Sequence, residues 1–334
     1  MAGFVCKFGG SSVADADQIK KIEKIIKQDP RRRYIVLSAP GKRHPGDQKI
    51  TDMLYQCQEL AGRGQDITGT FAGIKQRYLD IAAELRVKDE IEGVLDEIQQ
   101  NIQSGASRDY AASRGEYLCA RMMARYLGAA FIESAKYIRL TSRGGVDQYT
   151  YGLLAEKIKG EGMYVIPGFY GGGPDGEVRT FSRGGSDITG AIVARAAGAD
   201  LYENWTDVSG LLMTDPGIVE APRPIPEATY REIRELGACG AKVLHEEAIV
   251  PLYDQGIPIA IKNTNQPGHP GTTIVETRDT KEAPVAGIAG STGFRLLTAE
   301  KMLMGKEGYR EKLLDLVNQS NIGPVQMSVG VDSV

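Results

Sequence analysis

The segment 6–13, which reads CKFGGSSV, is the first place in the chain where residue types and spacing could do chemistry. The apolar residues before Lys7 predict a strand, and a helical pattern begins near Asp15 or Asp17. Glycine N–H groups can approach an anion closely, and a helix N-terminus adds a partial positive charge. Lys7 adds a full positive charge at the same place. The geometry alone favours a phosphate site and an ordinary glycine turn equally.

A second segment, 182–187 (SRGGSD), stands directly before a helical pattern over 188–199. It again pairs two glycines with a helix start, here beside Arg183 and Asp187. A guanidinium group can bind a carboxylate through two parallel hydrogen bonds, whereas an aspartate at a helix start can also be a simple N-cap. Two such helix starts in one chain favour a shared phosphate-transfer site, where a donor phosphate would lie beside a zwitterionic acceptor.

Two weaker motifs follow. The segment 204–210 (NWTDVSG), continued by Thr-Asp-Pro at 214–216, offers hydroxyl and carboxylate groups where a nucleotide base and ribose could lie. The segment 240–245 (GAKVLH) places Lys242 in an apolar stretch, although a lone lysine is usually solvated. The chain contains neither GxxxxGK[ST], nor GxGxxG after its first strand, nor the protein-kinase motifs, so phosphate chemistry requires a different scaffold.

The elements predicted around these motifs begin as β-α-β, which favours a parallel sheet covered on both faces. They are a helix rich in isoleucine at 19–26, a strand at 34–37, helices over about 50–127 with an apolar stripe at 91–102, a strand at 163–169, a hairpin-like loop at 171–176, a helix at 188–199 and a strand at 256–263 that closes the main domain. After 280–284 the pattern restarts with a strand at 294–298, a helix at 309–318 and a strand at 325–331.

Composition is that of a globular protein: 334 residues, 42% hydrophobic and 25% charged. A net charge of −3 does not indicate binding to nucleic acid or to an anionic membrane. The start lacks an apolar signal-peptide core, and no apolar run approaches the length of a membrane span. We therefore expect a cytoplasmic protein without nucleic-acid or membrane partners. The basic run 31–33 is interpreted as a solvated strand entry.

The four cysteines, at positions 6, 57, 119 and 239, have no metal or redox spacing, so we expect them to be buried and reduced. The three histidines are scattered. No metal site made by protein side chains is predicted, and any metal should be a hard cation carried by phosphates and carboxylates.

The residue identities in these motifs indicate a protein family more specifically than their expected geometry does. The opening KFGGSSV, SRGGSD at 182–187, WTDVxG at 205–210 and GAKVLH at 240–245 resemble the aspartate kinases of the amino acid kinase superfamily, as do Asn263-Thr264 and Pro-Gly-Thr at 270–272. The resemblance covers roughly residues 3–276. Acetylglutamate, glutamate 5- and uridylate kinases share that fold without this combination of motifs.

This resemblance implies a three-layer α/β/α sandwich with a mainly parallel central sheet. It places the catalytic domain at 1–282, with an acceptor-binding lobe at about 1–180 and a nucleotide-binding lobe at about 181–282. Residues 283–334 would be a partial ACT-like β-α-β segment, about half of one ACT domain. We expect such a chain to be weakly inhibited, or not inhibited, by lysine or threonine, and to form homo-oligomers.

The resemblance also implies roles for single residues. Lys7 and Lys242 would hold the ATP phosphates, and Asp187 would orient both lysines; these three are the predicted catalytic residues. The predicted ATP-binding residues are Lys7, Phe8, Gly9, Gly10, Thr206, Asp207, Leu212, Lys242 and Val243. The predicted aspartate-binding residues are Ser38, Thr51, Glu116, Arg183 and Ser186. Glu116 would bind the α-ammonium group, although a glutamate at a helix start is also favoured by the helix dipole.

The chain departs from the family pattern in the loop 41–49, which is longer and is interpreted as a surface insertion before Thr51. It also has Leu212 where a tyrosine is frequent and Gly217 where an arginine is frequent. The predicted activity is ATP- and Mg²⁺-dependent phosphorylation of the L-aspartate side chain. Two alternatives stay open: another carboxylate or carbamate kinase of this fold, and a non-catalytic amino acid sensor.

Overall fold

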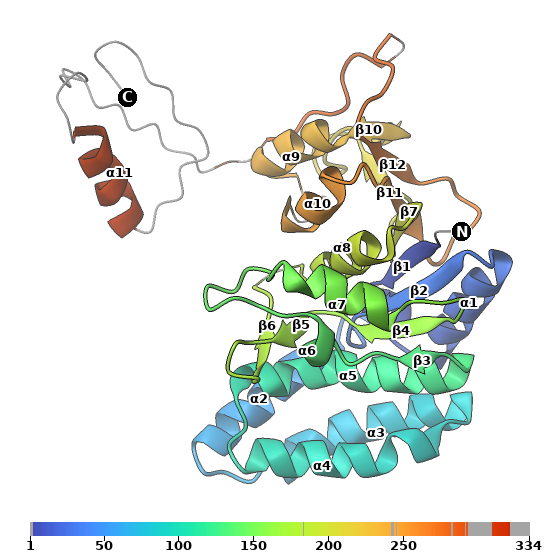
Figure 1. Ribbon diagram of the computed structural model, residues 1–334, viewed down its shortest axis with the longest axis vertical. Coiled ribbons are helices and arrows are strands. Elements are labelled where there is room, and N and C mark those ends of the chain that lie inside the picture. The colour runs from blue at the N-terminus through green and yellow to red at the C-terminus, as the bar shows by residue number, and fades with distance from the viewer. Residues whose placement is uncertain are drawn as a thin grey trace.

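The computed structural model describes residues 3–182, 184–241, 244, 246–281, 283–290, 292 and 309–320. Its centre is an eight-stranded sheet with the strand order β10-β12-β11-β7-β1-β2-β4-β3 (Figure 1). All neighbouring strands are parallel except β11 and β12. The strands are β1 (Phe4–Phe8), β2 (Arg32–Leu37), β3 (Ala130–Phe131), β4 (Tyr164–Pro167), β7 (Leu201–Thr206), β10 (Glu227–Thr229), β11 (Ile259–Asn263) and β12 (Thr272–Val275). The predicted mainly parallel sheet is confirmed.

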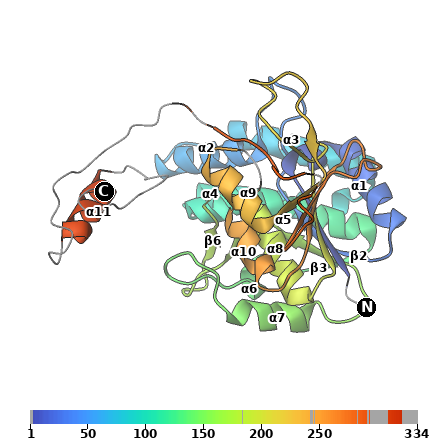
Figure 2. The ribbon, with the colours of Figure 1, turned by 90° about the horizontal axis from the view of Figure 1, so that it is seen from above.

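Helices cover both faces of this sheet, as expected for three layers (Figure 2). On one face lie α1 (Ala16–Gln28), α2 (Ile50–Gly62), α3 (Thr68–Leu85), α4 (Glu92–Gln103) and α5 (Arg108–Leu127), with the short 3₁₀ helices η1 (Gly10–Val13) and η2 (Lys88–Glu90). On the other lie α7 (Tyr149–Lys157), α8 (Gly185–Ala197), α9 (Tyr230–Ala238) and α10 (Glu246–Tyr253). The short α6 (Ser134–Tyr137) and the separate α11 (Tyr309–Gln319) complete the described helices.

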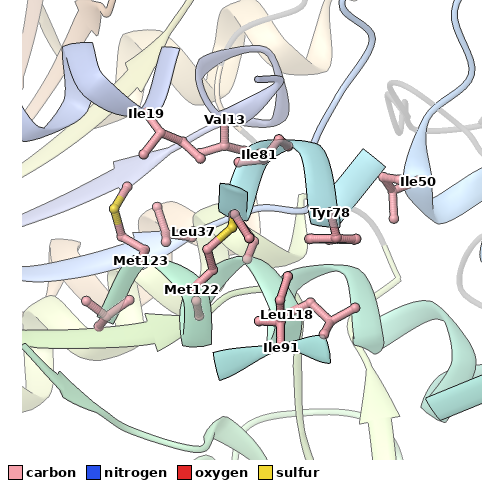
Figure 3. Close-up of a cluster of buried hydrophobic side chains, with 14 of the residues drawn as sticks. Val13, Ile19, Leu37, Ile50, Tyr78, Ile81, Ile91, Leu118, Met122 and Met123 are labelled. Carbon is pink, nitrogen blue, oxygen red and sulfur yellow. The ribbon is translucent and has the colours of Figure 1, made fainter. Parts of the chain in front are cut away.

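Successive side chains of β1 point to opposite faces of the sheet, so this strand contributes residues to both helix layers. Cys6 and Phe8 point into the hydrophobic cluster beneath α1–α5, whereas Val5 points into the cluster beneath α8. Figure 3 shows part of the first cluster, where Tyr78 of α3 and Met122 of α5 lie among buried aliphatic side chains. Lys7 lies on the same face of β1 as Val5, so the strand delivers a charged group to the α8 side.

Several predicted elements are confirmed. The region 50–127 is helical, α4 buries its apolar stripe, and the loop at 171–176 joins the antiparallel strands β5 (Tyr170–Gly172) and β6 (Val178–Thr180). The helix expected at 309–318 is α11. The strands expected at 294–298 and 325–331 lie outside the described residues.

One expectation about the sheet and one about the cysteines are wrong. The strand at 256–263 does not close the main domain, because β12 continues the sheet beyond β11 and β10 pairs with β12. Cysteines 6, 57 and 119 are buried as expected, but Cys239 is exposed at the end of α9. A second antiparallel pair, β8 (Leu211–Leu212) with β9 (Pro224–Ile225), lies apart from the main sheet.

The interpretation of 31–33 as a solvated strand entry is wrong for Arg32. Its Nε and Nη2 atoms donate to the two carboxylate oxygens of Glu203 at 2.8 and 3.0 Å, and the Glu203 side chain is only 3% exposed. Trp205 Nε1 and the Cys6 thiol also donate to Glu203, at 3.0 and 3.2 Å. This buried ion pair joins β2 to β7 across β1.

We expect Arg32→Ala to lower the free energy of unfolding by about 3–5 kcal/mol, because it leaves the buried carboxylate of Glu203 without its cation. Arg31→Ala is the matched control, since Arg31 is 55% exposed and pairs with Asp29 at the surface. Urea unfolding of both variants measures the difference. Equal losses in the two variants would contradict the assignment of a buried pair.

Candidate active site

Lys7, Asp187 and Asn204 form one hydrogen-bonded group at the centre of the sheet. The parallel register of β1 and β7 places Asn204 directly across from Lys7. Lys7 Nζ lies 2.6 Å from Asp187 Oδ1 and donates to Asn204 Oδ1 at 3.3 Å. Asn204 Nδ2 in turn donates to the same Asp187 Oδ1 at 3.0 Å. The structure therefore brings together two of the predicted catalytic residues and adds an asparagine that the sequence analysis gave no role.

The helix that carries Asp187 begins earlier than predicted. Helix α8 starts at Gly185, and its N-cap is Gly184, whose φ of 58° lies in the left-handed region that glycine adopts without strain. Asp187 is therefore inside the first turn and is not the N-cap residue. Its side chain is free to reach Lys7, and its backbone N–H donates to the Gly184 carbonyl at 2.8 Å.

Glycines allow the loops after β1 and β2 to cross in direct contact. The Gly41 N–H donates to the Gly10 carbonyl at 2.8 Å, and a Cβ on Gly41 would lie 2.7 Å from the Gly10 carbonyl carbon. The Gly9 N–H donates to the Trp205 carbonyl at 3.0 Å, and a Cβ on Gly9 would lie 3.7 Å from Lys7 Nζ. The turn that follows Phe8 is thus held between β2 and β7, beside the lysine.

Two residues predicted to bind aspartate lie close to this turn: Ser38 directly follows the carboxyl end of β2, and Ser186 lies in the first turn of α8. The Ser38 N–H donates to the Phe8 carbonyl at 3.1 Å, and the Gly168 N–H donates to the Leu37 carbonyl at 2.8 Å. A Cβ on Gly168 would lie 2.6 Å from Ser186 Oγ, so no larger residue fits there without displacing this hydroxyl. Parallel strands and the N-terminus of α8 therefore converge on one region, as is usual for ligand sites in open α/β sheets.

Glu116 is a buried carboxyl group next to this region. It is 5% exposed, the backbone N–H of Ala39 faces its carboxyl group, and its Oε2 has no hydrogen-bond partner among the described residues. Burial raises the pKa of Glu116 to about 8. Because an unpaired buried carboxyl is costly, its position directly behind Ser38-Ala39 suits a cationic group supplied by a ligand.

The longer loop 41–49 is exposed at residues 42–46, as predicted, but a buried arginine anchors it. Arg77 of α3 is 5% exposed and lies 3.4 Å from the Asp47 carboxylate, which also accepts from Arg43 Nε at 2.8 Å. These guanidinium groups hold the pKa of Asp47 well below its usual range. Arg77 also donates to the carbonyl groups of Ala14, Gly41 and Gln48.

Thr51, predicted to bind aspartate, is half-buried in the first turn of α2, directly after the loop 41–49.

Thr206 is the last residue of β7 and Asp207 follows it directly; both are predicted to contact the nucleotide. Their side chains bond to each other, with Thr206 Oγ1 donating to Asp207 Oδ1 at 3.1 Å. The Thr206 carbonyl accepts from the Thr264 N–H at 2.9 Å, and the Thr264 hydroxyl lies 2.7 Å from Ser12 Oγ. The first glycine turn is thereby tied to this side of the sheet. Leu212 lies in β8 and is 42% exposed.

Arg183, Lys242 and Val243 lie outside the described residues, so the structure places none of these three predicted ligands. Within the described part of the chain, no group of three or more His, Cys, Asp or Glu side chains could hold a metal ion. Nor is any described helix long and apolar enough to cross a membrane.

The fold and the Lys7–Asp187 site place the chain in a class of phosphotransferases: residues 3–263 match the amino acid kinase family, and the chain belongs to it. Within that family it belongs with the aspartokinases. Aspartokinase 3 of Bacillus subtilis is 37% identical over 347 residues, which cover 99% of this chain and 76% of that protein.

Two solved structures of aspartate kinases are similar to this chain over nearly its whole length. Clostridium acetobutylicum aspartate kinase superposes with a TM-score of 0.90 and 47% identity, covering 99% of this chain and 77% of that chain. E. coli aspartokinase III in complex with aspartate and ADP superposes with a TM-score of 0.79 and 26% identity, again covering 99% and 77%. The resemblance inferred from the motifs is confirmed.

Proposed function

We propose that this chain transfers the γ-phosphoryl group of ATP to the side-chain carboxylate of L-aspartate, giving 4-phospho-L-aspartate and ADP. The observation that carries the proposal is the Lys7–Asp187 pair at a glycine turn, with the unpaired carboxyl of Glu116 behind the neighbouring loop. A cation beside backbone N–H groups suits a transferring phosphoryl group, and an anion suits the ammonium group of an amino acid. The relative from E. coli that binds aspartate and ADP supports both ligands.

In the proposed reaction a carboxylate oxygen of aspartate attacks the γ-phosphorus, and the bond from that phosphorus to the bridging oxygen of ADP breaks. The nucleophile is already ionised near neutral pH, so no side chain has to remove a proton. The residues act by positioning and by neutralising charge. Lys7 and Lys242 would contact phosphate oxygens, and Asp187 would orient Lys7. Arg183, Ser38, Thr51 and Ser186 would hold the acceptor.

Mg²⁺ would supply further charge neutralisation on the β- and γ-phosphate oxygens. Because the described side chains offer no cluster that could hold a metal by themselves, the ATP phosphates would carry much of its coordination. The nucleotide base and ribose would lie near Thr206, Asp207 and Leu212, with Phe8, Gly9, Gly10 and Val243 completing the ATP site.

We further propose that residues 1–282 form the catalytic unit, with acceptor and nucleotide lobes meeting near residue 180, and that 283–334 are an ACT-like segment. The acyl phosphate would enter the synthesis of lysine, threonine and methionine in the cytoplasm, and the chain would act as a homo-oligomer.

The test of this function is ADP release by the purified chain with ATP, Mg²⁺ and a panel of amino acids. L-Aspartate should be the acceptor that raises ADP release most, well above glutamate, acetylglutamate and carbamate. Preference for another carboxylate or carbamate would assign a different kinase of this fold. Binding of amino acids without any ADP release would assign a sensor.

Arg183→Ala should raise KM for aspartate by roughly 10- to 100-fold with a smaller effect on KM for ATP, because the guanidinium group is assigned to a substrate carboxylate. Initial rates with each substrate varied in turn measure both constants. A collapse of ATP affinity at unchanged KM for aspartate would move Arg183 to the phosphate side of the site.

A further inference from the structure

Asn204 is a polar side chain in a place where the fold favours apolar ones. It lies in the middle of β7 with 6% exposure, between Lys7 on β1 and Ile261 on β11. A buried amide is costly unless both of its ends are hydrogen-bonded. Here both ends are bonded, and both partners are charged groups of the candidate active site.

The partners determine which way the amide group points. A lysine ammonium can only donate, so it must face Asn204 Oδ1; an ionised carboxylate can only accept, so it must face Nδ2. The distances, 3.3 Å to Lys7 Nζ and 3.0 Å to Asp187 Oδ1, fit this orientation. The negative end of the amide dipole therefore faces Lys7, and its positive end faces Asp187.

This bridge changes what each charged group can do. Asp187 Oδ1 accepts from both Lys7 and Asn204, so its negative charge is shared between two donors and holds the lysine less tightly. Lys7 has three N–H donors, of which Asp187 and Asn204 take two. With two donors fixed, the direction of the third is also fixed, and it remains for a ligand.

We propose that Asn204 is a positioning residue. It fixes the Lys7 ammonium so that one N–H stays directed at the transferring phosphoryl group, and it keeps Asp187 from accepting a hydrogen bond from that N–H. The proposal rests on the proposed function, in which Lys7 contacts this group. Asn204 itself need not touch the substrate.

Asn204→Leu keeps the size of the side chain and removes both hydrogen bonds. We expect kcat to fall by roughly 10- to 100-fold, as for lost hydrogen bonds to charged groups, while KM for aspartate changes less than about twofold. The melting temperature should stay equal or rise, because an apolar residue replaces a buried amide. A residue that only supported the fold would instead lower the melting temperature and leave kcat of the folded protein unchanged.

Tyr202→Phe is the matched control. Tyr202 lies on the same face of β7, two residues from Asn204, and its hydroxyl donates to the backbone carbonyl of Asp187 at 3.2 Å. The variant therefore removes a hydrogen bond to Asp187 without touching the Lys7–Asp187–Asn204 group. We expect its kcat to remain within about twofold of the wild type.

Asn204→Asp keeps the acceptor toward Lys7 but replaces the Nδ2 donor by a second carboxylate oxygen. Among the described residues, the titratable groups bonded to Asn204 are Lys7 and Asp187. The Tyr202 hydroxyl bonds to the Asp187 carbonyl, and Ile261 on the β11 side is apolar. Two carboxylates this close share a proton, and the protonated form can donate as the amide does. The ratio of kcat in this variant to kcat in the wild type should therefore rise at least about threefold as pH falls from 8.5 to 6.

The outcomes separate this inference from the proposed function. If Lys7→Ala is inactive while Asn204→Leu keeps kcat within about threefold of the wild type, the positioning role is wrong and the function stands. A kcat ratio for Asn204→Asp that does not change with pH would also overturn the role of the Nδ2 donor. If the wild-type chain does not phosphorylate aspartate, the proposed function itself fails.

Discussion

Lys7→Ala should lower kcat by roughly 10²- to 10³-fold while the protein stays folded, because a preorganised cation is lost from the oxygens of the transferring phosphoryl group. The loss should appear in kcat and in kcat/KM together, since this contact strengthens as the phosphoryl group transfers. Steady-state ADP release under saturating ATP and aspartate measures it.

Lys20→Ala is the control for this prediction. Lys20 is an exposed lysine on α1 whose Nζ pairs with Asp17 and Glu84 at the surface, so its removal should leave turnover unchanged. Circular dichroism of both variants should show the same helical content. Turnover of Lys7→Ala close to that of the Lys20→Ala control would refute the assignment of Lys7.

Glu116→Gln should raise KM for aspartate by roughly 10- to 100-fold with little change in KM for ATP, because the amide cannot pair with the α-ammonium group. The wild type should also show a distinctive pH dependence. Burial raises the pKa of Glu116 to about 8, so near pH 6.5 the free protein holds this carboxyl protonated. KM for aspartate should therefore fall as pH rises through about 8, and this fall should be missing in the variant.

The same shift predicts how stability depends on pH. The pKa of Glu116 is near 4.5 when unperturbed and about 8 in the folded protein, so the folded state binds the proton more tightly than the unfolded state. Unfolding thus becomes easier as pH rises from about 4.5 to about 8, and Glu116→Gln removes this contribution. The melting temperature of the variant minus that of the wild type should grow over this range and then level off. A constant difference would contradict the raised pKa.

The sequence predicted the layers of the fold because these depend on local patterns. Isoleucines at helical spacing, the apolar strand before Lys7 and the paired glycines before two helices each need only a few neighbouring residues to be recognised. The contact between Lys7 and Asp187 was implied by the family resemblance, and the two side chains lie 2.6 Å apart.

Local patterns do not reveal the contacts of three other residues: Asn204, Arg77 and Arg32. Asn204 acts through the register of β1 against β7, and its partner Lys7 is 197 positions away in the sequence. Arg77 acts through backbone carbonyls, which every residue carries and which no motif marks. Arg32 looked solvated because its neighbours are basic, whereas the carboxylate that accounts for its burial is 171 positions away.

The most direct test of the central claim is to trap the product of the reaction. An acyl phosphate reacts with hydroxylamine, so the purified chain with ATP, Mg²⁺, L-aspartate and hydroxylamine should form the hydroxamate of the aspartate side chain, in amounts equal to the ADP released. Mass spectrometry identifies which carboxyl group carries the hydroxamate. Release of ADP without this hydroxamate, or a hydroxamate at the α-carboxyl group, would contradict phosphorylation of the aspartate side chain.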